Sequence, residues 1–273
     1  MKILIVGLGS MGKRHKANAV ALGHEVRTVD IITGADCSGI DSALVADDRH
    51  FDAAVVASPS HLHYSHTMEL LDWGIPVMVE KPLAITGDQA LELYERVDPA
   101  FPKGNPGEGV VNMVAQSYRF HKGVNLLKEM LSPAWADKMG GIGEPLLVEY
   151  TSGQHLSQWY PGRDFREMYV AQKDMGGGVV LTSLTHLIDT MRYLFSSFSL
   201  EGGFARNSGT LGIDVEDTAT LMGTANGAPF VATSDFLQPR HIHRIKVTGS
   251  NGVGMLDLVR NSYEWTDGTR SYD

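Results

Sequence analysis

The stretch from Lys2 to Asp30 constrains the fold of this chain more than any other. Residues 2–6 are rich in β-branched side chains and predict a strand, which runs directly into Gly7-Leu8-Gly9-Ser10-Met11-Gly12. A helical pattern follows, stops at Gly23 and gives way to a second strand over 25–29. The order of strand, G-x-G-x-x-G, helix, strand and acid is typical of a dinucleotide-binding site in a parallel α/β sheet.

The glycines and the acid each have a task in such a site. The first glycine makes the tight turn, the second lets the backbone approach the pyrophosphate, and the third lets helix and strand pack closely. The helix N-terminus adds free N–H groups and a positive dipole for the phosphates. Asp30 lies 18 residues after Gly12, close to the spacing expected for an acid on the adenine ribose.

Asp30 also predicts which dinucleotide is bound. A carboxylate at this position hydrogen-bonds the 2′-hydroxyl of NAD and repels the 2′-phosphate of NADP. Ile31 and the two residues after it provide no arginine to offset that repulsion. The sequence therefore favours NAD over NADP.

A second motif ends a further predicted strand. An apolar run over 76–79 is followed directly by Glu80, Lys81 and Pro82. The strand should end there, because proline has no backbone N–H to donate to a neighbouring strand. In open parallel sheets, ligands bind at the carboxyl ends of the strands. A lysine held there among apolar neighbours can have a lowered pKa and exchange a proton with a substrate hydroxyl. Taken alone, this motif is more simply interpreted as an exposed Glu80–Lys81 pair that ends a strand. The glycine motif upstream favours the interpretation of Lys81 as a catalytic residue.

Composition narrows the classes of partner. The chain has 273 residues and a net charge of −9, and this negative charge argues against nucleic acid or an anionic membrane as partner. It has one cysteine, Cys37, which predicts a cytoplasmic protein. The start of the chain lacks an Ala-x-Ala cleavage pattern and is interpreted as a strand, not a signal sequence. His61, His63 and His66 lie close together, but their spacing does not complete a zinc pattern, so no metal is expected.

Two domains are predicted, over residues 1–120 and 121–273. The first also holds a strand over 52–57, a helix over 61–73, a helix over 87–97, a surface loop over 99–109 and a strand over 110–117. The second holds a helix over 121–131, a strand over 144–152, a polar and aromatic segment over 154–173, a long helix over 178–195 and hairpins over 200–259. An α/β domain is thus followed by an α+β domain with a mainly antiparallel open sheet.

Three landmarks together resemble a known family. The glycine motif, the Ser58-Pro59 segment with His63, and Glu80-Lys81-Pro82 have the order and spacing of the Gfo/Idh/MocA oxidoreductases, which include glucose–fructose oxidoreductase and inositol dehydrogenases. Tyr118-Arg119 and Gly176-Gly177-Gly178 with His186 are similar to two later landmarks. The resemblance implies an N-terminal Rossmann domain and a C-terminal domain whose open sheet often serves as an oligomer interface. It also implies hydride transfer between nicotinamide and a sugar-like carbon, with Lys81 and His186 at the reacting centre.

The chain departs from the family pattern at two points. Family members often carry an aspartate four residues before the histidine of the glycine-led helix, where this chain has Thr182. In a regular helix Thr182 and His186 share a face, but a threonine cannot act as a carboxylate base, so more of the proton transfer is expected from Lys81. The chain is also shorter than many members. A core or interface histidine remains the alternative for His186.

The segment 152–166 is similar to one found in members near bacterial nonulosonate or surface-sugar pathways. Trp159 can offer an apolar face to a sugar ring, and Arg163 and Arg166, with Arg119, can hold a carboxylate or phosphate. The alternative is that the arginines pair with Asp164 and Glu167 on an exposed loop.

The predicted function is that of an NAD(P)-dependent oxidoreductase acting on a sugar, inositol or sugar-nucleotide derivative, including an acidic or surface-sugar precursor. The alternative is a catalytically silent NAD-binding sensor or assembly protein. We expect a homo-oligomer, dimer or tetramer. The residues predicted to hold the cofactor are Gly7, Leu8, Gly9, Ser10, Met11, Gly12, Asp30, Ile31, Ser58, Pro59, His63, Glu80 and Lys81. Those predicted to hold the substrate are Arg119, Trp159, Arg163, Arg166, Thr182 and His186.

Overall fold

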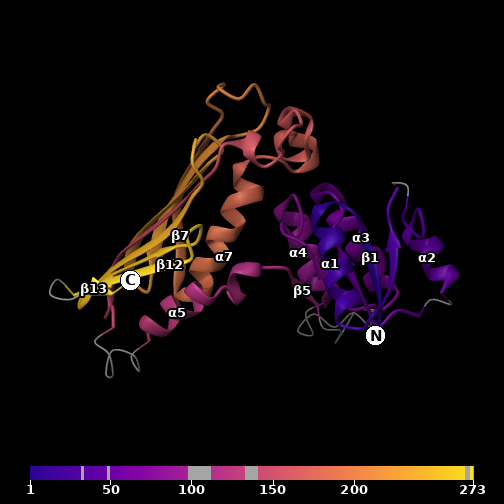
Figure 1. The fold of residues 1–273 in the computed structure, drawn as a ribbon, viewed down its shortest axis with the longest axis horizontal. Coiled ribbons are helices and arrows are strands. Elements are labelled where there is room, and N and C mark those ends of the chain that lie inside the picture. The colour runs from indigo at the N-terminus through magenta and orange to yellow at the C-terminus, as the bar shows by residue number, and fades with distance from the viewer. Residues whose placement is uncertain (32–33, 48–49, 98–111, 133–140, 268–270, 273) are drawn as a thin grey trace. The chain divides into compact units, whose positions relative to one another are not determined.

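The chain divides into two compact units in a computed structural model (Figure 1). The structure describes all residues except 32–33, 48–49, 98–111, 133–140, 268–270 and 273. Unit 1 is Met1–Ala115 and unit 2 is Gln116–Asp273, where the sequence placed the boundary at residue 120. The loop expected over 99–109 lies outside the described residues.

Unit 1 is built on a five-stranded sheet in the order β2-β1-β3-β4-β5. All of its strand pairs are parallel, and the order reverses between β1 and β3, as at the switch point of a doubly wound fold. Its strands are β1 Lys2–Val6, β2 Glu25–Val29, β3 Ala53–Val56, β4 Val77–Val79 and β5 Met113–Val114. Its helices are α1 Ser10–Ala21, α2 Ile40–Ala46, α3 His63–Asp72 and α4 Gly87–Val97. The predicted α/β domain is confirmed.

The core of unit 1 explains why its strands read as continuous apolar runs. Leu4, Val6, Val56, Val77 and Val79 are all buried, because helices cover both faces of a doubly wound parallel sheet. The helix expected over 61–73 begins as a 3₁₀ turn and becomes α-helical only at position 63.

The prediction of a strand over 110–117 is wrong in the length of the strand. Residues 110–111 lie outside the described residues; within the rest, β5 spans Met113–Val114 and residues 117–120 form a 3₁₀ turn. The reason is the partner strand: Ala115 N–H still donates to the Val79 carbonyl, but β4 ends at that residue and offers no ladder beyond it.

Unit 2 is built on an eight-stranded sheet in the order β13-β12-β11-β10-β6-β9-β8-β7. Its strands are β6 Pro145–Gly153, β7 Phe198–Arg206, β8 Thr218–Ala225, β9 Ala228–Asp235, β10 Ile242–Gly249, β11 Gly252–Asp257, β12 Ser262–Thr266 and β13 Ser271–Tyr272. The helices α5 Lys122–Met130 and α7 Thr185–Leu194 lie along one face of this sheet (Figure 1). Their buried residues, Val124 and Leu187 among them, share one core with Tyr150 and Ile245 of the sheet.

Four features of unit 2 add to the expectation or differ from it. β6 and β9 pair in parallel, although every other pair is antiparallel. Strands β12 and β13 extend the sheet past the predicted hairpins. The helix expected over 178–195 starts with a π turn, Val180–Leu184, and only then becomes α7. The polar and aromatic segment over 154–173 forms short 3₁₀ turns.

No helix among the described residues is long and apolar enough to cross a membrane.

A buried ion-pair network in unit 1 generates a prediction about pH. Asp47 accepts hydrogen bonds from Arg27 at 2.7 and 3.0 Å and lies 2.5 Å from the Lys2 ammonium. Bonding to Arg27 and Lys2 outweighs burial and lowers the pKa of Asp47 to about 2. A depressed folded-state pKa gives stability above the unfolded pKa that is lost as pH falls through the folded one. We expect Asp47→Asn to reduce the free energy of unfolding at pH 7 and to flatten its fall between about pH 4 and 2.

The control for this network is Asp72→Asn. Asp72 also pairs with an arginine, Arg96, but its side chain is 63% exposed, so its loss should cost less than about 1 kcal/mol. Urea unfolding at several pH values measures both variants. Equal losses at pH 7 would contradict the structural role given to Asp47.

Candidate functional site

The glycine turn between β1 and α1 has the shape that a dinucleotide requires. Gly7 has a φ of +96°, and a Cβ on Gly12 would lie 1.7 Å from the Gly7 carbonyl oxygen, so neither position accepts a side chain. At Gly9 a Cβ would meet nothing within 4 Å. The first and third glycines are therefore fixed by packing, and the space in front of the second is open for a pyrophosphate.

Asp30 follows β2 and is tied to this turn. Leu8 N–H donates to its carboxylate at 2.5 Å. The next residue, Ile31, is 92% exposed. The acid expected at the adenine ribose thus lies beside the glycine motif, and the residues of the turn present the pattern of an NAD site.

Lys81 follows β4, at the carboxyl edge of the sheet, as the sequence predicts. It is partly buried, and the peptide bond to Pro82 is cis. Burial lowers the pKa of the Lys81 ammonium, and the neighbouring Glu80 carboxylate opposes this shift. A lysine with a lowered pKa at this edge gives up its proton more readily than an ordinary lysine and can serve in proton exchange.

His63 joins two loops of the site. Its Nδ1 lies 2.6 Å from the Pro82 carbonyl oxygen and its Nε2 lies 2.8 Å from the Ser58 carbonyl oxygen. The side chain is 2% exposed, and burial lowers its pKa while the two carbonyls oppose this. The sequence placed this histidine among the cofactor-binding residues. In the structure it is buried and contacts the loops after β3 and β4.

Sequence reasoning missed a second histidine. His15 Nε2 lies 2.8 Å from Glu80 Oε1, and both side chains are largely buried. The contact ties α1, which the glycine turn opens, to the residue that precedes Lys81. The signal was available in principle, because His15 is three residues after Gly12 and so lies on the helix face that packs on the sheet.

In unit 2, Thr182 does not share a regular helix face with His186. Thr182 lies within the π turn, where the spacing of an α-helix does not hold. Its hydroxyl donates to the Gly178 carbonyl oxygen at 2.6 Å, and the residue is 2% exposed. The ring of His186 packs edge-on against Tyr118, with ring centroids 5.0 Å apart. Tyr118 in turn contacts His243, which the sequence did not single out.

Two of the three arginines that the sequence assigned to a cationic pocket, Arg119 and Arg166, have carboxylate or carbonyl partners. Arg119 donates three hydrogen bonds to Asp189, at 2.6, 2.9 and 3.1 Å. Arg166 bonds Asp164 at 3.1 Å and the Leu211 carbonyl at 3.1 Å, which is the pairing that the sequence left as an alternative. Arg163 is exposed. The charges of Arg119 and Arg166 are thus offset locally.

Trp159 is not presented as an open platform. Its ring is partly buried and packs edge-on against Phe236, with centroids 5.4 Å apart. This contact makes it part of the wall of the unit 2 core.

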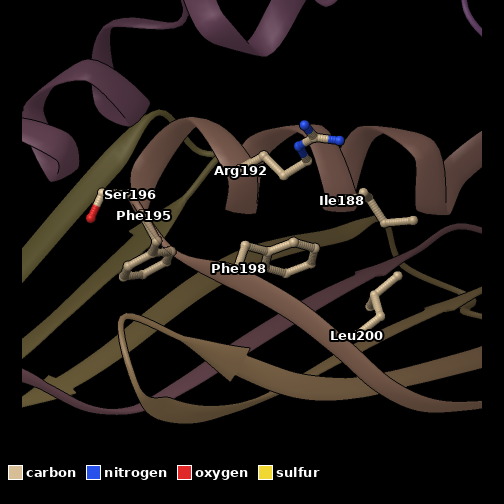
Figure 2. A pocket seen from close by; sticks show the side chains of 6 residues that line it. All are labelled: Ile188, Arg192, Phe195, Ser196, Phe198 and Leu200. Carbon is tan, nitrogen blue, oxygen red and sulfur yellow. The ribbon is translucent and has the colours of Figure 1, made fainter.

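A hollow elsewhere in unit 2 lies between α7 and β7 (Figure 2). Its lining residues are Ile188, Arg192, Phe195, Ser196, Phe198 and Leu200. They are mostly apolar, and none belongs to the residues predicted for the site. Among the described residues, no group of three or more His, Cys, Asp or Glu side chains is placed to hold a metal ion.

Both units match family models. Residues 1–100 match the oxidoreductase family with an NAD-binding Rossmann fold, and residues 137–253 match the GFO/IDH/MocA C-terminal domain. The chain belongs to the Gfo/Idh/MocA oxidoreductase family.

Named family members give this assignment detail. The chain is 28% identical to levoglucosan dehydrogenase of Pseudarthrobacter phenanthrenivorans over 219 residues, which covers 71% of this chain and 52% of that protein. It is 23% identical to scyllo-inositol 2-dehydrogenase (NAD(+)) of Bacillus subtilis over 287 residues, which covers 96% and 75%. Against the structure of levoglucosan dehydrogenase in complex with NADH, the TM-score is 0.79 at 23% identity, with 100% of this chain and 78% of that chain covered.

Length separates this chain from some members of the Gfo/Idh/MocA family. It spans about half the length of levoglucosan dehydrogenase and of the inositol 2-dehydrogenase of Mycolicibacterium gilvum, 52% in each case. At 23% identity, the structural likeness to levoglucosan dehydrogenase shows a shared fold.

The glycine turn gives a paired prediction. Gly12→Ala places a methyl group against the Gly7 carbonyl, so the backbone must move and the melting temperature without cofactor should fall. Gly9→Ala meets no atom within 4 Å, so the melting temperature should hold, but the methyl occupies the approach of the pyrophosphate. We expect its Kd for NAD to rise about tenfold or more, a loss of about 1.4 kcal/mol or greater.

Thermal melts and calorimetric titration with NAD measure these two effects. Gly87→Ala is the matched control, because a Cβ there also meets nothing within 4 Å and the residue begins α4, outside the glycine motif of residues 7–12. Unchanged NAD affinity in Gly9→Ala would contradict the assignment of this turn as the pyrophosphate site.

Proposed function

We propose that this protein is an NAD(P)-dependent oxidoreductase that prefers NAD and acts on a hydroxyl or ketone carbon of a sugar, inositol or sugar-nucleotide derivative. The observation that carries the proposal is Lys81, a partly buried lysine with a lowered pKa at the carboxyl edge of a dinucleotide-binding sheet. Relatives named as levoglucosan, inositol and xylose dehydrogenases support the substrate class.

In unit 1, some residues would hold the cofactor and others fix the position of Lys81. Residues 7–12 and Asp30 would bind the pyrophosphate and the adenine ribose, because the turn is open at Gly9 and Asp30 lies beside it. The Asp30 carboxylate favours NAD. When bound, the nicotinamide supplies the hydride acceptor or donor. Glu80 and His63 fix the backbone on either side of Lys81.

Lys81 would take the proton of the substrate hydroxyl during oxidation and return it during reduction. Its lowered pKa makes the neutral amine accessible without strong alkali. The family resemblance assigns His186 of unit 2 a substrate-orienting role, which we keep as part of the proposal. Thr182 supplies no base and its hydroxyl bonds the Gly178 carbonyl, so the proton transfer rests on the lysine.

The pairing of the arginines favours a neutral substrate. The charges of Arg119 and Arg166 are offset by Asp189 and Asp164, which leaves Arg163 as the remaining arginine of the predicted cationic pocket. A neutral polyol is therefore preferred over the acidic sugar expected from the segment 152–166. A catalytically silent NAD-binding protein is the less favoured alternative, because cofactor binding alone does not need a lysine of lowered pKa at this edge.

The mechanistic test is Lys81→Met. Removing the proton-exchanging amine while keeping most of the side-chain volume should lower kcat by about 10²–10⁴-fold and leave the Kd for NAD within about twofold. In the native protein, kcat for alcohol oxidation should rise with pH through a pKa below the ordinary 10.5 of lysine, because the neutral amine is the base. Nicotinamide absorbance with levoglucosan, inositols and xylose measures turnover.

Lys122→Met is the matched control, since this lysine is exposed at the start of α5 in unit 2. Full turnover in Lys81→Met would remove the proton-transfer role. If no sugar or polyol in a broad panel reacts with the native protein, the silent NAD-binding alternative becomes the better description.

We also propose a homo-oligomer built on the sheet of unit 2; a cytoplasmic location stays a prediction from Cys37. Helices cover one face of the sheet (Figure 1), and Leu147, Met222 and Val231 on strands β6, β8 and β9 are exposed. Met222 and Val231 are cross-strand partners, so their side chains share a face. An apolar face of this kind favours association with a second copy.

Light scattering at micromolar concentration tests the association. The native protein should be a dimer or larger, and the double variant Met222→Glu/Val231→Glu should shift it toward a monomer. Leu91→Glu, at an exposed apolar position of α4, should leave the mass unchanged. A native monomer would overturn the proposal.

A further inference from the structure

The free edge of β2 is completed by residues that follow Asp30 in the chain. β2 is the edge strand of the unit 1 sheet and pairs with β1. On its other side, the Thr28 N–H donates to the Asp36 carboxylate at 2.8 Å, and the Thr28 carbonyl accepts from the Cys37 N–H at 3.0 Å. Cys37 also forms a parallel bridge with Val29. Asp36 and Cys37 thus take the place of a neighbouring strand.

The side chain of Asp36 provides the acceptor that Thr28 needs. Its Oδ2 accepts from the Thr28 N–H, at 2.8 Å, and from the Thr28 hydroxyl, at 2.7 Å. The Asp36 N–H donates in return to Thr28 Oγ1 at 3.1 Å. Thr28 is 0% exposed, so water cannot replace the carboxylate, and a buried donor without an acceptor is costly. Bonding to Thr28 lowers the pKa of Asp36 more than burial raises it, so the carboxylate is ionised near neutral pH and can only accept.

Asp30 is held through the same contacts. Its N–H donates to the Cys37 carbonyl oxygen at 3.1 Å, and its carboxylate accepts from the Leu8 N–H at 2.5 Å. The backbone of Asp30 is therefore fixed by Cys37. Cys37 in turn is fixed against β2 by its own N–H and by the bonds of its neighbour Asp36 to Thr28. The position of the Asp30 carboxylate thus depends on Asp36.

We propose that Asp36 is a positioning residue for cofactor choice. It holds Cys37, and through it Asp30, where the Asp30 carboxylate accepts from the 2′-hydroxyl of NAD and repels the 2′-phosphate of NADP. This proposal rests on the preference for NAD in the proposed function. A hydrogen bond to the ribose needs a fixed acceptor, because it weakens steeply as its distance and angle depart from the optimum. A segment that is ordered before the cofactor binds also loses less entropy on binding.

Positioning by Asp36 differs from a direct effect of its charge. Asp36 is exposed, and its negative charge alone would disfavour a phosphate nearby. The bonds to Thr28, however, use a single oxygen, Oδ2. An amide oxygen has two lone pairs and can accept both bonds, so Asp36→Asn keeps the positioning contacts and removes the charge. Asp36→Ala removes both.

Hydrogen exchange tests the contacts without a cofactor. In the native protein, followed by NMR without NAD, the Asp30 amide should be protected, because it donates to Cys37. In Asp36→Ala it should exchange at least about threefold faster, since the edge of β2 opens more easily. In Asp36→Asn its exchange rate should stay within about twofold of the native rate.

Calorimetric titration with NAD and NADP tests the consequence for cofactor choice. Asp36→Ala should raise the Kd for NAD about 3- to 10-fold, the cost of weakening one hydrogen bond to the ribose, and leave the Kd for NADP within about twofold. The preference for NAD then falls by the same factor. Asp36→Asn should keep the native preference within about twofold.

Two further variants complete the set. Thr28→Val keeps the Asp36 charge but removes the hydroxyl that bonds to it, so it should reduce the preference for NAD in the same direction as Asp36→Ala. Asp41→Ala is the matched control, because it removes another exposed carboxylate of unit 1, in the first turn of α2, and should leave both Kd values unchanged. Thermal melts show whether each variant is folded, and Thr28→Val decides the question if Asp36→Ala is not.

The role of Asp36 is refuted if Asp36→Ala keeps the native preference for NAD. It is also refuted if Asp36→Asn loses the preference as fully as Asp36→Ala while Thr28→Val keeps it, since that pattern assigns the effect to charge. Asp30→Asn separates this from the proposed function, because it should remove the preference whatever Asp36 does. If the native protein binds NADP as tightly as NAD, the proposed preference fails and with it the role in cofactor choice, while amide exchange still decides whether Asp36 holds Asp30.

Discussion

A single buried imidazole holds together the loops on which the site of unit 1 depends. The His63 ring packs between the carbonyl oxygens of Ser58 and Pro82, in the segments that follow β3 and β4, and as a neutral imidazole it donates its single N–H to one of them. From the other side, His15 on α1 holds Glu80, the residue before Lys81. The glycine turn, the Ser58 loop and the lysine are therefore one mechanical assembly. A proton-exchanging group needs such support, because small displacements at a reacting centre cost large factors in rate.

Unit 2 uses a different device for the same purpose. Where the family pattern often has an aspartate, Thr182 bonds the backbone of its own π turn and supplies no charge to His186. The polar order beside His186 comes instead from neutral groups, Tyr118, His243 and Tyr150, anchored on strands β6 and β10 and on the turn before α5. Neutral hydrogen bonds orient without attracting anions, which agrees with arginines whose charges are offset by Asp189 and Asp164.

The sequence predicted what depends on local pattern and missed what depends on distant partners. Strands such as β1, β2 and β10 were found with their bounds, because apolar runs and alternation are local signals. The parallel pairing of β6 with β9, about 80 residues apart, has no local signal, nor does the end of β5, which is set by β4. Lys81 and Asp30 were found from motifs. His15, His243 and the partners of Arg119 were not, since each depends on a contact between elements far apart in the chain.

The proposed proton exchange between Lys81 and a substrate hydroxyl depends on the pKa of Lys81. Selective ¹³C labelling of lysine and an NMR titration of the Cε signal, assigned with Lys81→Met, measures it in the native protein with and without NAD. Burial should place the pKa of Lys81 clearly below 10.5. A Lys81 pKa at or above 10.5 would contradict its role as the proton-exchanging group.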